Sequence, residues 1–231
     1  MISRASFLEN LEKIQERIAL ACDRYGRNQE DVCLLPVTKN WPVDAVAHCQ
    51  SAGIERVGEN RVQEARAKQE QISGVKWDLI GHLQSNKINQ VVGNFARIQT
   101  VDSVKLIKKL QIAAENKGQK CDIFLQVNAG NDPAKYGFMV DEVTDALDQV
   151  LESPSLKIEG LMTIAPFAPE DPQVAQSCFQ RLAKLRDSLQ NSHHLSLQHL
   201  SMGMSDDLES AIAEGSTMIR VGSALFGSRL H

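Results

Sequence analysis

The sequence predicts an α/β fold of the (β/α)8 TIM-barrel class, a single domain with an extra N-terminal helix. Eight short apolar runs rich in β-branched residues recur along the 231 residues, and a helical pattern follows each run. Eight such steps fit a closed barrel at its small end, since barrels typically need ~250 residues. No linker or composition break marks a second domain, so residues 1–231 are expected to form one domain.

The element before the first strand is predicted to be a helix. Ser6 and Glu9 fit a capping box, and apolar residues recur at helical spacing at Leu8, Leu11, Ile14 and Ile18. Later helices carry their own end signals. Pro42 suits a first helical position, Ser103 suits an N-cap, and Gly118 suits the position after a helix end.

The strands are expected at the eight apolar runs. In chain order these are Val32–Val37, Ile54–Gly58, Trp77–Gly81, Arg97–Val101, Asp122–Val127, Ile158–Ile164, His199–Met202 and Met218–Gly222. An open doubly wound sheet is the competing architecture, but it usually has fewer strands and a glycine-rich turn after the first. Here the first run leads into Thr38-Lys39-Asn40, which has no glycine, so the closed barrel is favoured.

Composition excludes several classes of protein. The hydrophobic content of 42% and charged content of 23% are ordinary for a soluble globular protein. A formal net charge of -4 without any basic block argues against nucleic acid as a partner. No apolar stretch approaches membrane-spanning length, and the first residues lack the apolar core of a signal peptide. We therefore expect a cytoplasmic protein with no membrane partner.

Cysteine usage agrees with a reducing compartment. The five cysteines are widely spaced and form no C-x-x-C pair, so neither a disulfide framework nor a metal site is indicated. Cys33 and Cys121 fall in or beside apolar strand runs and are expected to be small buried hydrophobes.

Lys39 stands where the first apolar run stops. An ammonium group is strongly hydrated and costly to place at the mouth of a packed strand. At the C-terminal end of a barrel strand, a desolvated lysine amine can become a nucleophile towards an aldehyde. The alternative is a solvated lysine that caps the strand.

The turns after the last two strands are rich in small residues. Ser201 and Ser205 flank the first of these turns, and Gly222 and Ser223 form the second. Such turns allow close backbone approach and suit a phosphate, which many barrels bind at this place. The alternative is two ordinary tight turns, and Asp206 beside Ser205 counts mildly against a phosphate.

Three further residues are candidates for the barrel mouth. Strand parity puts Arg220 on the inward face with Met218 and Gly222, where a guanidinium needs an acceptor, either a carboxylate or a ring nitrogen of a ligand. His82 could be a base or a ring-stacking group, or a residue with a structural hydrogen bond. Asn60 could bind a ligand hydroxyl or stabilise its own loop. A Ser–His–Asp relay lacks the supporting G-x-S-x-G motif.

The chain resembles the pyridoxal phosphate homeostasis protein family in ordered motifs along nearly its whole length. The motifs are Val37-Thr38-Lys39, Gly58–Glu64, Ile80–Lys87, Val101-Asp102-Ser103, Gln126-Val127-Asn128, Gly160–Ile164, Leu200–Asp206 and Arg220–Gly227. Small departures occur at Thr38-Lys39-Asn40, where serine, lysine and threonine are frequent, and at Asn128–Asn131.

The resemblance implies a barrel like the N-terminal domain of alanine racemase and a pyridoxal 5′-phosphate (PLP) cofactor. It implies a Schiff base from Lys39 and Arg220 against the pyridine nitrogen. It further implies Ser201, Ser205, Gly222 and Ser223 around the phosphate, with Asn60, His82 and Met162 lining the ring pocket. No metal and no catalytic residue is implied.

The expected function is cofactor binding in vitamin B6 homeostasis, as a carrier or buffer without catalysis, with PLP-dependent apoenzymes as recipients. A cationic arginine leaves the ring nitrogen unprotonated and weakens the cofactor as an electron sink. The chain stops after the eighth step, so we expect neither the racemase C-terminal domain nor its dimer interface, and a monomer. The alternatives are a weak amino-acid racemase using His82 or Tyr136 as second base, and a cofactor-free aldolase using Lys39.

Overall fold

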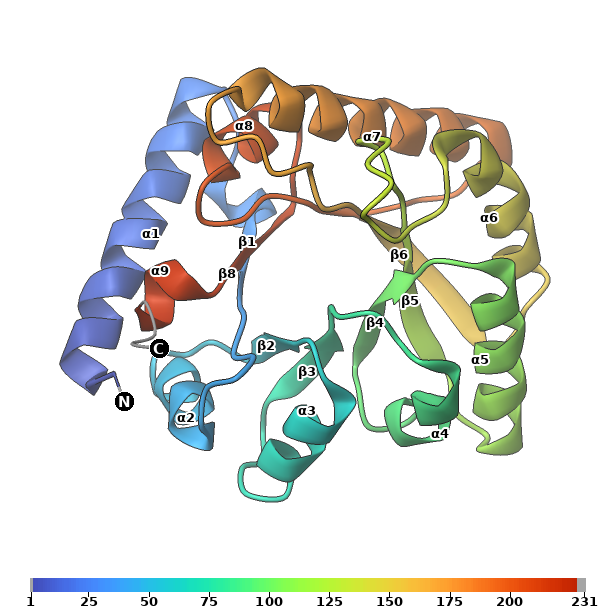
Figure 1. Cartoon of the computed structure of the whole chain (residues 1–231), viewed down its shortest axis with the longest axis horizontal. Coiled ribbons are helices and arrows are strands. Elements are labelled where there is room, and N and C mark those ends of the chain that lie inside the picture. The colour runs from blue at the N-terminus through green and yellow to red at the C-terminus, as the bar shows by residue number, and fades with distance from the viewer. Residues whose placement is uncertain (1, 228–231) are drawn as a thin grey trace.

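The computed structural model describes residues 2–227, in which eight parallel strands form a ring (Figure 1). The strands are β1 (Cys33–Pro36), β2 (Arg56–Glu59), β3 (Lys76–Leu79), β4 (Arg97–Val101), β5 (Cys121–Gln126), β6 (Leu156–Met162), β7 (His199–Ser201) and β8 (Met218–Val221). Their hydrogen-bonded order is β1-β8-β7-β6-β5-β4-β3-β2. Val37 bridges Gly58 between β1 and β2, which closes the ring and confirms the predicted barrel.

The helices surround the strands on the outside (Figure 1). They are α1 (Arg4–Arg24), α2 (Val43–Ser51), α3 (Val62–Gln69), α4 (Ile88–Val91), α5 (Val104–Asn116), α6 (Val143–Leu151), α7 (Pro172–His193), α8 (Leu208–Ala213) and α9 (Ser223–Phe226). Short 3-10 helices occupy Gln29–Asp31, Ser85–Lys87 and Val140–Glu142. Among the described residues, none of these helices combines the length and apolar character needed to cross a bilayer.

The start of α1 differs from the prediction. Ser3, not Ser6, is the N-cap, because its side chain accepts a hydrogen bond from the Ser6 backbone N–H at 3.1 Å. The helix therefore begins one turn earlier than the expected capping box. Leu11, Ile14 and Ile18 are buried as predicted, whereas Phe7 is buried in place of Leu8.

Other end signals behave as predicted or nearly so. The Ser103 side chain accepts from the Leu106 backbone N–H and caps α5, and Gly118 follows that helix with a φ of 59°. Pro42 is the N-cap of α2 rather than its first helical residue.

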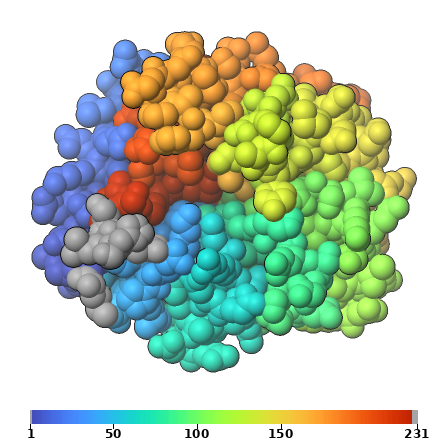
Figure 2. Space-filling view, in the orientation of Figure 1, coloured from blue at the N-terminus to red at the C-terminus, as the bar shows by residue number. Residues whose placement is uncertain are grey.

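The N-terminal helix closes the outer layer of the barrel. The helix after β8, α9, has only four residues, and α1 packs against it and against α8. Arg17 forms a bidentate pair with Glu209 at 2.8 and 2.9 Å, and the Phe7 and Phe226 rings stack 5.6 Å apart. Figure 2 shows the blue N-terminal helix directly beside the red C-terminal segment.

The apolar core has two layers. The larger lies between the strands and the helices, and a smaller one fills the barrel with Leu35, Val37, Ile80, Phe124, Met162 and Met218. The rest of the interior is polar and contains the fully buried side chains of Asp78 and Gln99. Cys121 is buried as expected, but Cys33 is exposed because it opens β1 at the end of the barrel away from the mouth.

Candidate functional site

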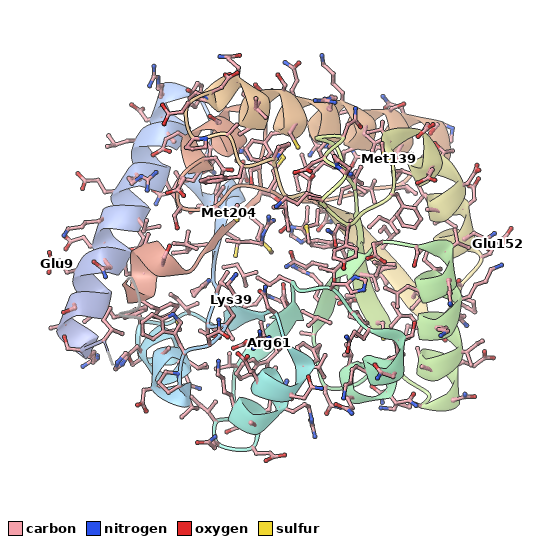
Figure 3. All side chains as sticks on the ribbon, viewed as in Figure 1. Glu9, Lys39, Arg61, Met139, Glu152 and Met204 are labelled. Atoms are coloured by element: carbon pink, nitrogen blue, oxygen red, sulfur yellow. The ribbon has the colours of Figure 1, made fainter. Side chains whose placement is uncertain are left out.

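A cavity of about 450 Å³ opens at the end of the barrel where the strands finish, beside β1, β2 and β8. Six of the residues predicted from the sequence line it: Lys39, Asn60, Ser205, Arg220, Gly222 and Ser223. Apolar walls that the sequence did not single out come from Val37, Trp41, Ile80 and Ile164. Figure 3 shows Lys39 and Met204 near the centre of the ring, while Glu9 and Glu152 lie on its outside.

Lys39 belongs to the turn that follows β1. The Thr38 N–H donates to the Gly58 carbonyl at 3.0 Å, and the Trp41 N–H donates back to the Thr38 carbonyl at 3.0 Å. Asn40 adopts a φ of 59°, which turns the chain sharply after the lysine. Lys39 itself is exposed in this turn.

A buried ion pair between Lys68 and Glu59 fixes the turn that contains Lys39. Lys68 of α3 donates to the Thr38 carbonyl at 2.7 Å and pairs with Glu59 at 2.5 Å, and the Thr38 hydroxyl donates to the same Glu59 oxygen at 2.6 Å. Burial raises the pKa of Glu59, against the opposing effect of Lys68. Sequence reasoning missed this pair, although Lys68 shares a helical face with Val62 and Ala65, both apolar.

Arg220 lies under the cavity and is 5% exposed. One Nη donates to the Ser201 hydroxyl and the other to the Thr163 carbonyl, both at 2.8 Å. Within residues 2–227, no carboxylate pairs with this guanidinium. Burial lowers the pKa of Arg220 to about 10, an effect that Asp207 opposes, so the group is a cation at neutral pH. The structural ion pair considered from the sequence is therefore not formed.

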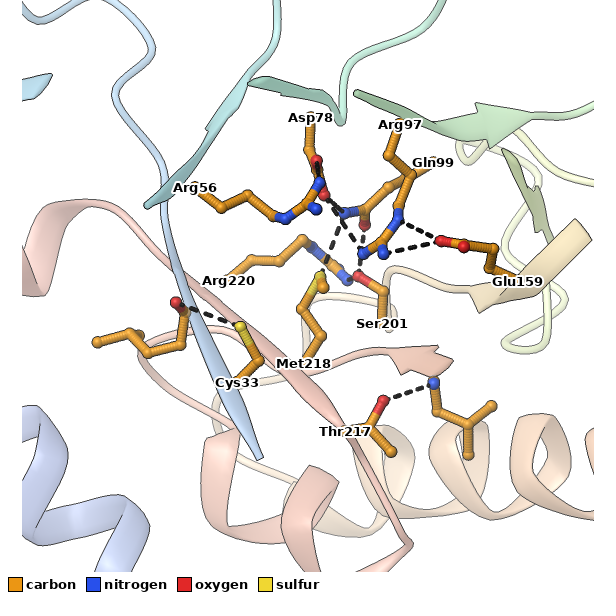
Figure 4. A network of polar contacts seen from close by, with 12 residues as sticks. Cys33, Arg56, Asp78, Arg97, Gln99, Glu159, Ser201, Thr217, Met218 and Arg220 are labelled. Atoms are coloured by element: carbon orange, nitrogen blue, oxygen red, sulfur yellow. Dashed lines mark hydrogen bonds and ion pairs between the residues drawn. The ribbon is translucent and has the colours of Figure 1, made fainter. Parts of the chain in front are cut away.

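Ser201 is fully buried and does not line the cavity. Its hydroxyl accepts from Arg220 and donates to Gln99 Oε1 at 2.6 Å, and Gln99 Nε2 donates to Asp78 at 2.6 Å (Figure 4). Asp78 in turn pairs with Arg56 and Arg97. The predicted phosphate contact thus lies beneath the arginine, inside the barrel.

His82 and Met162 also lie outside the cavity wall. The His82 Nδ1 lies 2.9 Å from an Asp102 oxygen, and its ring stacks on Tyr136 at 4.1 Å. Met162 is fully buried in the inner apolar cluster of the barrel. A direct contact of either residue with a cofactor stays a prediction.

The remaining chemistry of the described part is simple. No group of three or more histidine, cysteine or acidic side chains there could hold a metal ion. An amine and a desolvated cation face one cavity with apolar walls and small residues at one end. Such a site suits a small planar ligand that carries an aldehyde and an acceptor atom.

Comparison with known proteins agrees with this geometry. Residues 9–230 match the family described as alanine racemase, N-terminal domain. The chain is 37% identical to the pyridoxal phosphate homeostasis protein of Aquifex aeolicus over 225 residues, which cover 96% of this chain and 98% of that protein.

Solved structures give the same picture. PipY of Synechococcus elongatus, with PLP bound, matches with a TM-score of 0.81 at 37% identity, covering 93% of this chain and 100% of that chain. An alanine racemase of Clostridium difficile has the same fold, with a TM-score of 0.75 at 14% identity, and the match covers 57% of that racemase. These nearly full-length similarities show that the chain belongs to the pyridoxal phosphate homeostasis protein family, whose barrel is that of the alanine racemase N-terminal domain.

Proposed function

We propose that this protein binds pyridoxal 5′-phosphate reversibly in the cavity and acts in intracellular vitamin B6 homeostasis as a carrier or buffer. In this proposal the whole chain serves as one cofactor-binding domain, works as a monomer in the cytoplasm, and passes the cofactor to PLP-dependent apoenzymes. The unpaired thiols of all five cysteines suit a reducing compartment.

The main observation behind the proposal is the burial of Arg220 and the hydrogen bonds that it makes. A buried guanidinium is stable only when its N–H groups find acceptors, and the described residues accept from just two of its nitrogens. The group lines the same cavity as the Lys39 amine. A pyridine ring in that cavity, with an unprotonated nitrogen, would supply a further acceptor for Arg220. The cavity of about 450 Å³ falls within the usual range of small-ligand sites, ~300–1,000 Å³.

The residues present fit the cofactor at each of its parts. PLP supplies an aldehyde that condenses with a lysine amine and releases water, and we assign Lys39 to that Schiff base. Arg220 holds the ring nitrogen, Asn60 and Ile80 lie along the ring, and Ser205, Gly222 and Ser223 surround the phosphate. The PLP-bound PipY structure, at 37% identity, supports PLP as the ligand.

The same arginine favours binding over catalysis. Strong electron sinks need a protonated ring nitrogen, which a carboxylate partner maintains. Arg220 remains protonated at neutral pH because its pKa is about 10, and a cation cannot accept a proton from the ring. His82 and Tyr136, the residues considered as a second base, stack on each other away from the cavity wall.

The linkage to Lys39 is tested by reconstitution. We expect wild type with PLP to show a visible absorption band, and borohydride to fix the cofactor on the peptide that contains Lys39. Lys39→Ala loses both signals, while Lys108→Ala, at an exposed position of α5, keeps them. A band that survives in Lys39→Ala contradicts the assignment.

The carrier role is tested by transfer. We expect loaded protein to activate an apoenzyme while a trap removes free aldehyde, and to form no D-amino acid from L-amino acids. Activation that disappears with the trap argues against direct transfer, and robust racemisation argues for an enzyme.

A further inference from the structure

Beneath Arg220, three buried hydrogen bonds have fixed donors and acceptors and connect Arg220 to Asp78 through Ser201 and Gln99. Ser201 has a single hydroxyl proton, and it is donated to Gln99 Oε1 at 2.6 Å. The hydroxyl can therefore only accept from Arg220, at 2.8 Å. The Ser201 oxygen thus fixes the guanidinium, and the hydrogen bond from Ser201 to Gln99 sets the orientation of that oxygen.

Gln99 supplies that orientation. An amide side chain can be turned to present either its oxygen or its NH2 group. Asp78 decides between them, because its Oδ2 accepts from Gln99 Nε2 at 2.6 Å and the other polar neighbours of this carboxylate, Arg56 and Arg97, are donors as well. The amide oxygen must then face Ser201. The relay runs from β3 through β4 and β7 to β8 (Figure 4).

Gln99 also stands between two opposite charges. Figure 4 shows its amide between the Asp78 carboxylate and the Ser201–Arg220 pair. Without the Gln99 amide, the Ser201 hydroxyl would lose the acceptor that fixes its direction. Arg220 would then lose the oriented oxygen that holds its guanidinium in place.

We infer that Gln99 is a positioning residue for ligand recognition, which keeps the free N–H groups of Arg220 directed into the cavity without touching the ligand. Gln99 is fully buried and lies outside the cavity wall. The inference rests on the proposed function only for the identity of the ligand. The orientation of Arg220 can be measured in the ligand-free protein.

The first test uses PLP-loaded protein. We expect Gln99→Leu and Ser201→Ala each to speed cofactor dissociation about tenfold, the size expected for one lost hydrogen bond to a charged group. The double variant should dissociate no faster than either single one, since both changes break the same relay. Fully additive effects, or wild-type rates in both single variants, overturn the inference.

A spectroscopic readout separates positioning from general loosening. The ring-nitrogen ¹⁵N shift of labelled PLP should move towards its free value in Gln99→Leu and Ser201→Ala. It should stay unchanged in Thr100→Val, a neighbouring buried residue on β4 that loses a hydrogen bond to the Gly81 carbonyl. An equal movement in Thr100→Val means that Gln99 acts only through packing.

The ligand-free protein provides the second test. The Arg220 side-chain N–H signals should exchange faster with solvent in Gln99→Leu than in wild type. Unchanged exchange overturns the inference, whether or not PLP binds. Failure of wild type to bind PLP defeats the proposed function instead. If Gln99→Leu does not fold, Ser201→Ala, which leaves the Gln99–Asp78 contact in place, carries both tests.

Discussion

At the scale of single residues, Arg220 is held in a state that favours binding at the expense of stability. It is buried with neutral partners only, at the Ser201 hydroxyl and the Thr163 carbonyl. Removing a charge from water without an ionic partner is costly, and proteins retain such groups mainly where function needs them. The ligand-free protein therefore bears a cost that an acceptor in the cavity relieves.

Arg220→Met tests this division between stability and binding. We expect the ligand-free variant to unfold at a temperature equal to or above that of wild type, because the desolvated charge is gone. The increase in Tm at saturating PLP should shrink, since the variant binds the cofactor more weakly. Arg181→Met, at an exposed position of α7, should change neither value. A ligand-free variant that unfolds at a temperature well below that of wild type would show that the buried Arg220 charge does not destabilise the protein.

Gly81 shows how closely the backbones approach at the cavity. A Cβ atom built on it would lie 2.1 Å from the Asn60 carbonyl oxygen, which is far inside van der Waals contact. We expect Gly81→Ala to destabilise the protein by about 3 kcal/mol or more, as in overpacking against rigid backbone, and to displace Asn60. Urea unfolding measures the loss. Gly118→Ala, where open space leaves only the strain of positive φ, should cost about 1–2 kcal/mol.

At the scale of elements, α3 is tied to the turn that carries Lys39. The Lys68–Glu59 pair crosses from the helix to β2 and holds Thr38 through its carbonyl and hydroxyl. The second Glu59 oxygen is buried without a partner. Such a pair specifies one position of the turn more than it adds to stability.

Lys68→Met should break this tie in a pH-dependent way. Glu59 has a raised pKa in the folded state, so its contribution to stability is present below the ordinary value of 4.5 and is lost as pH rises through the folded-state pKa. Without Lys68 that pKa rises further. The variant should therefore be close to wild type at low pH and less stable by about 3–5 kcal/mol near neutrality.

Urea unfolding at several pH values measures the difference. Lys13→Met, which breaks the exposed Lys13–Glu9 pair, serves as the control and should have almost no effect. A deficit in Lys68→Met that does not vary with pH would show that Glu59 is not its source.

The sequence was sufficient for the order of elements but not for contacts across the barrel. Each apolar run overlapped its strand, because hydrophobic periodicity is a local signal, but four runs missed one or two residues at a strand end. The cap of α1 was misplaced because Ser3 and Ser6 are both acceptable caps, and a local pattern does not distinguish them. Ser201 lies under Arg220 and outside the cavity wall, a depth that strand stagger sets, and its contact with a phosphate stays a prediction.

The relay through Gln99 could not be found from one sequence. Its longest step joins Gln99 to Ser201, which are 102 residues apart, and the two meet only after the ring has closed. The burial of Lys68 could have been predicted from the sequence, because a lysine on an otherwise apolar helix face stands out from the pattern. His82 and Met162 follow the family resemblance, and their direct contact with a cofactor stays a prediction.

At the scale of the whole molecule, the closed ring and its helices shield most thiols. Cys22, Cys49, Cys121 and Cys178 are buried, whereas Cys33 is exposed. Burial raises the pKa of Cys49 to about 12 and that of Cys121 to about 11, which disfavours their reactive thiolates further. Partial burial raises the pKa of the Cys33 thiol as well, so the exposure of Cys33 and not a low pKa makes it the most accessible thiol.

Thiol titration of the folded protein should therefore detect one fast-reacting cysteine. We expect one equivalent of a disulfide reagent to react with the folded protein and all five cysteines to react after denaturation. Cys33→Ser should abolish the fast phase. A second fast thiol in the native protein would show that the outer helices open more readily than the packing suggests.

The pairing of β1 with β8 has a consequence for how the chain is made. A ribosome synthesises β1 long before β8, so the growing chain carries a strand with an unsatisfied edge until residues 218–221 emerge. The N-terminal helix waits equally long for α8 and α9, against which it packs. The nascent barrel is thus most prone to mispairing late in translation, when seven strands are present and the last is still inside the exit tunnel.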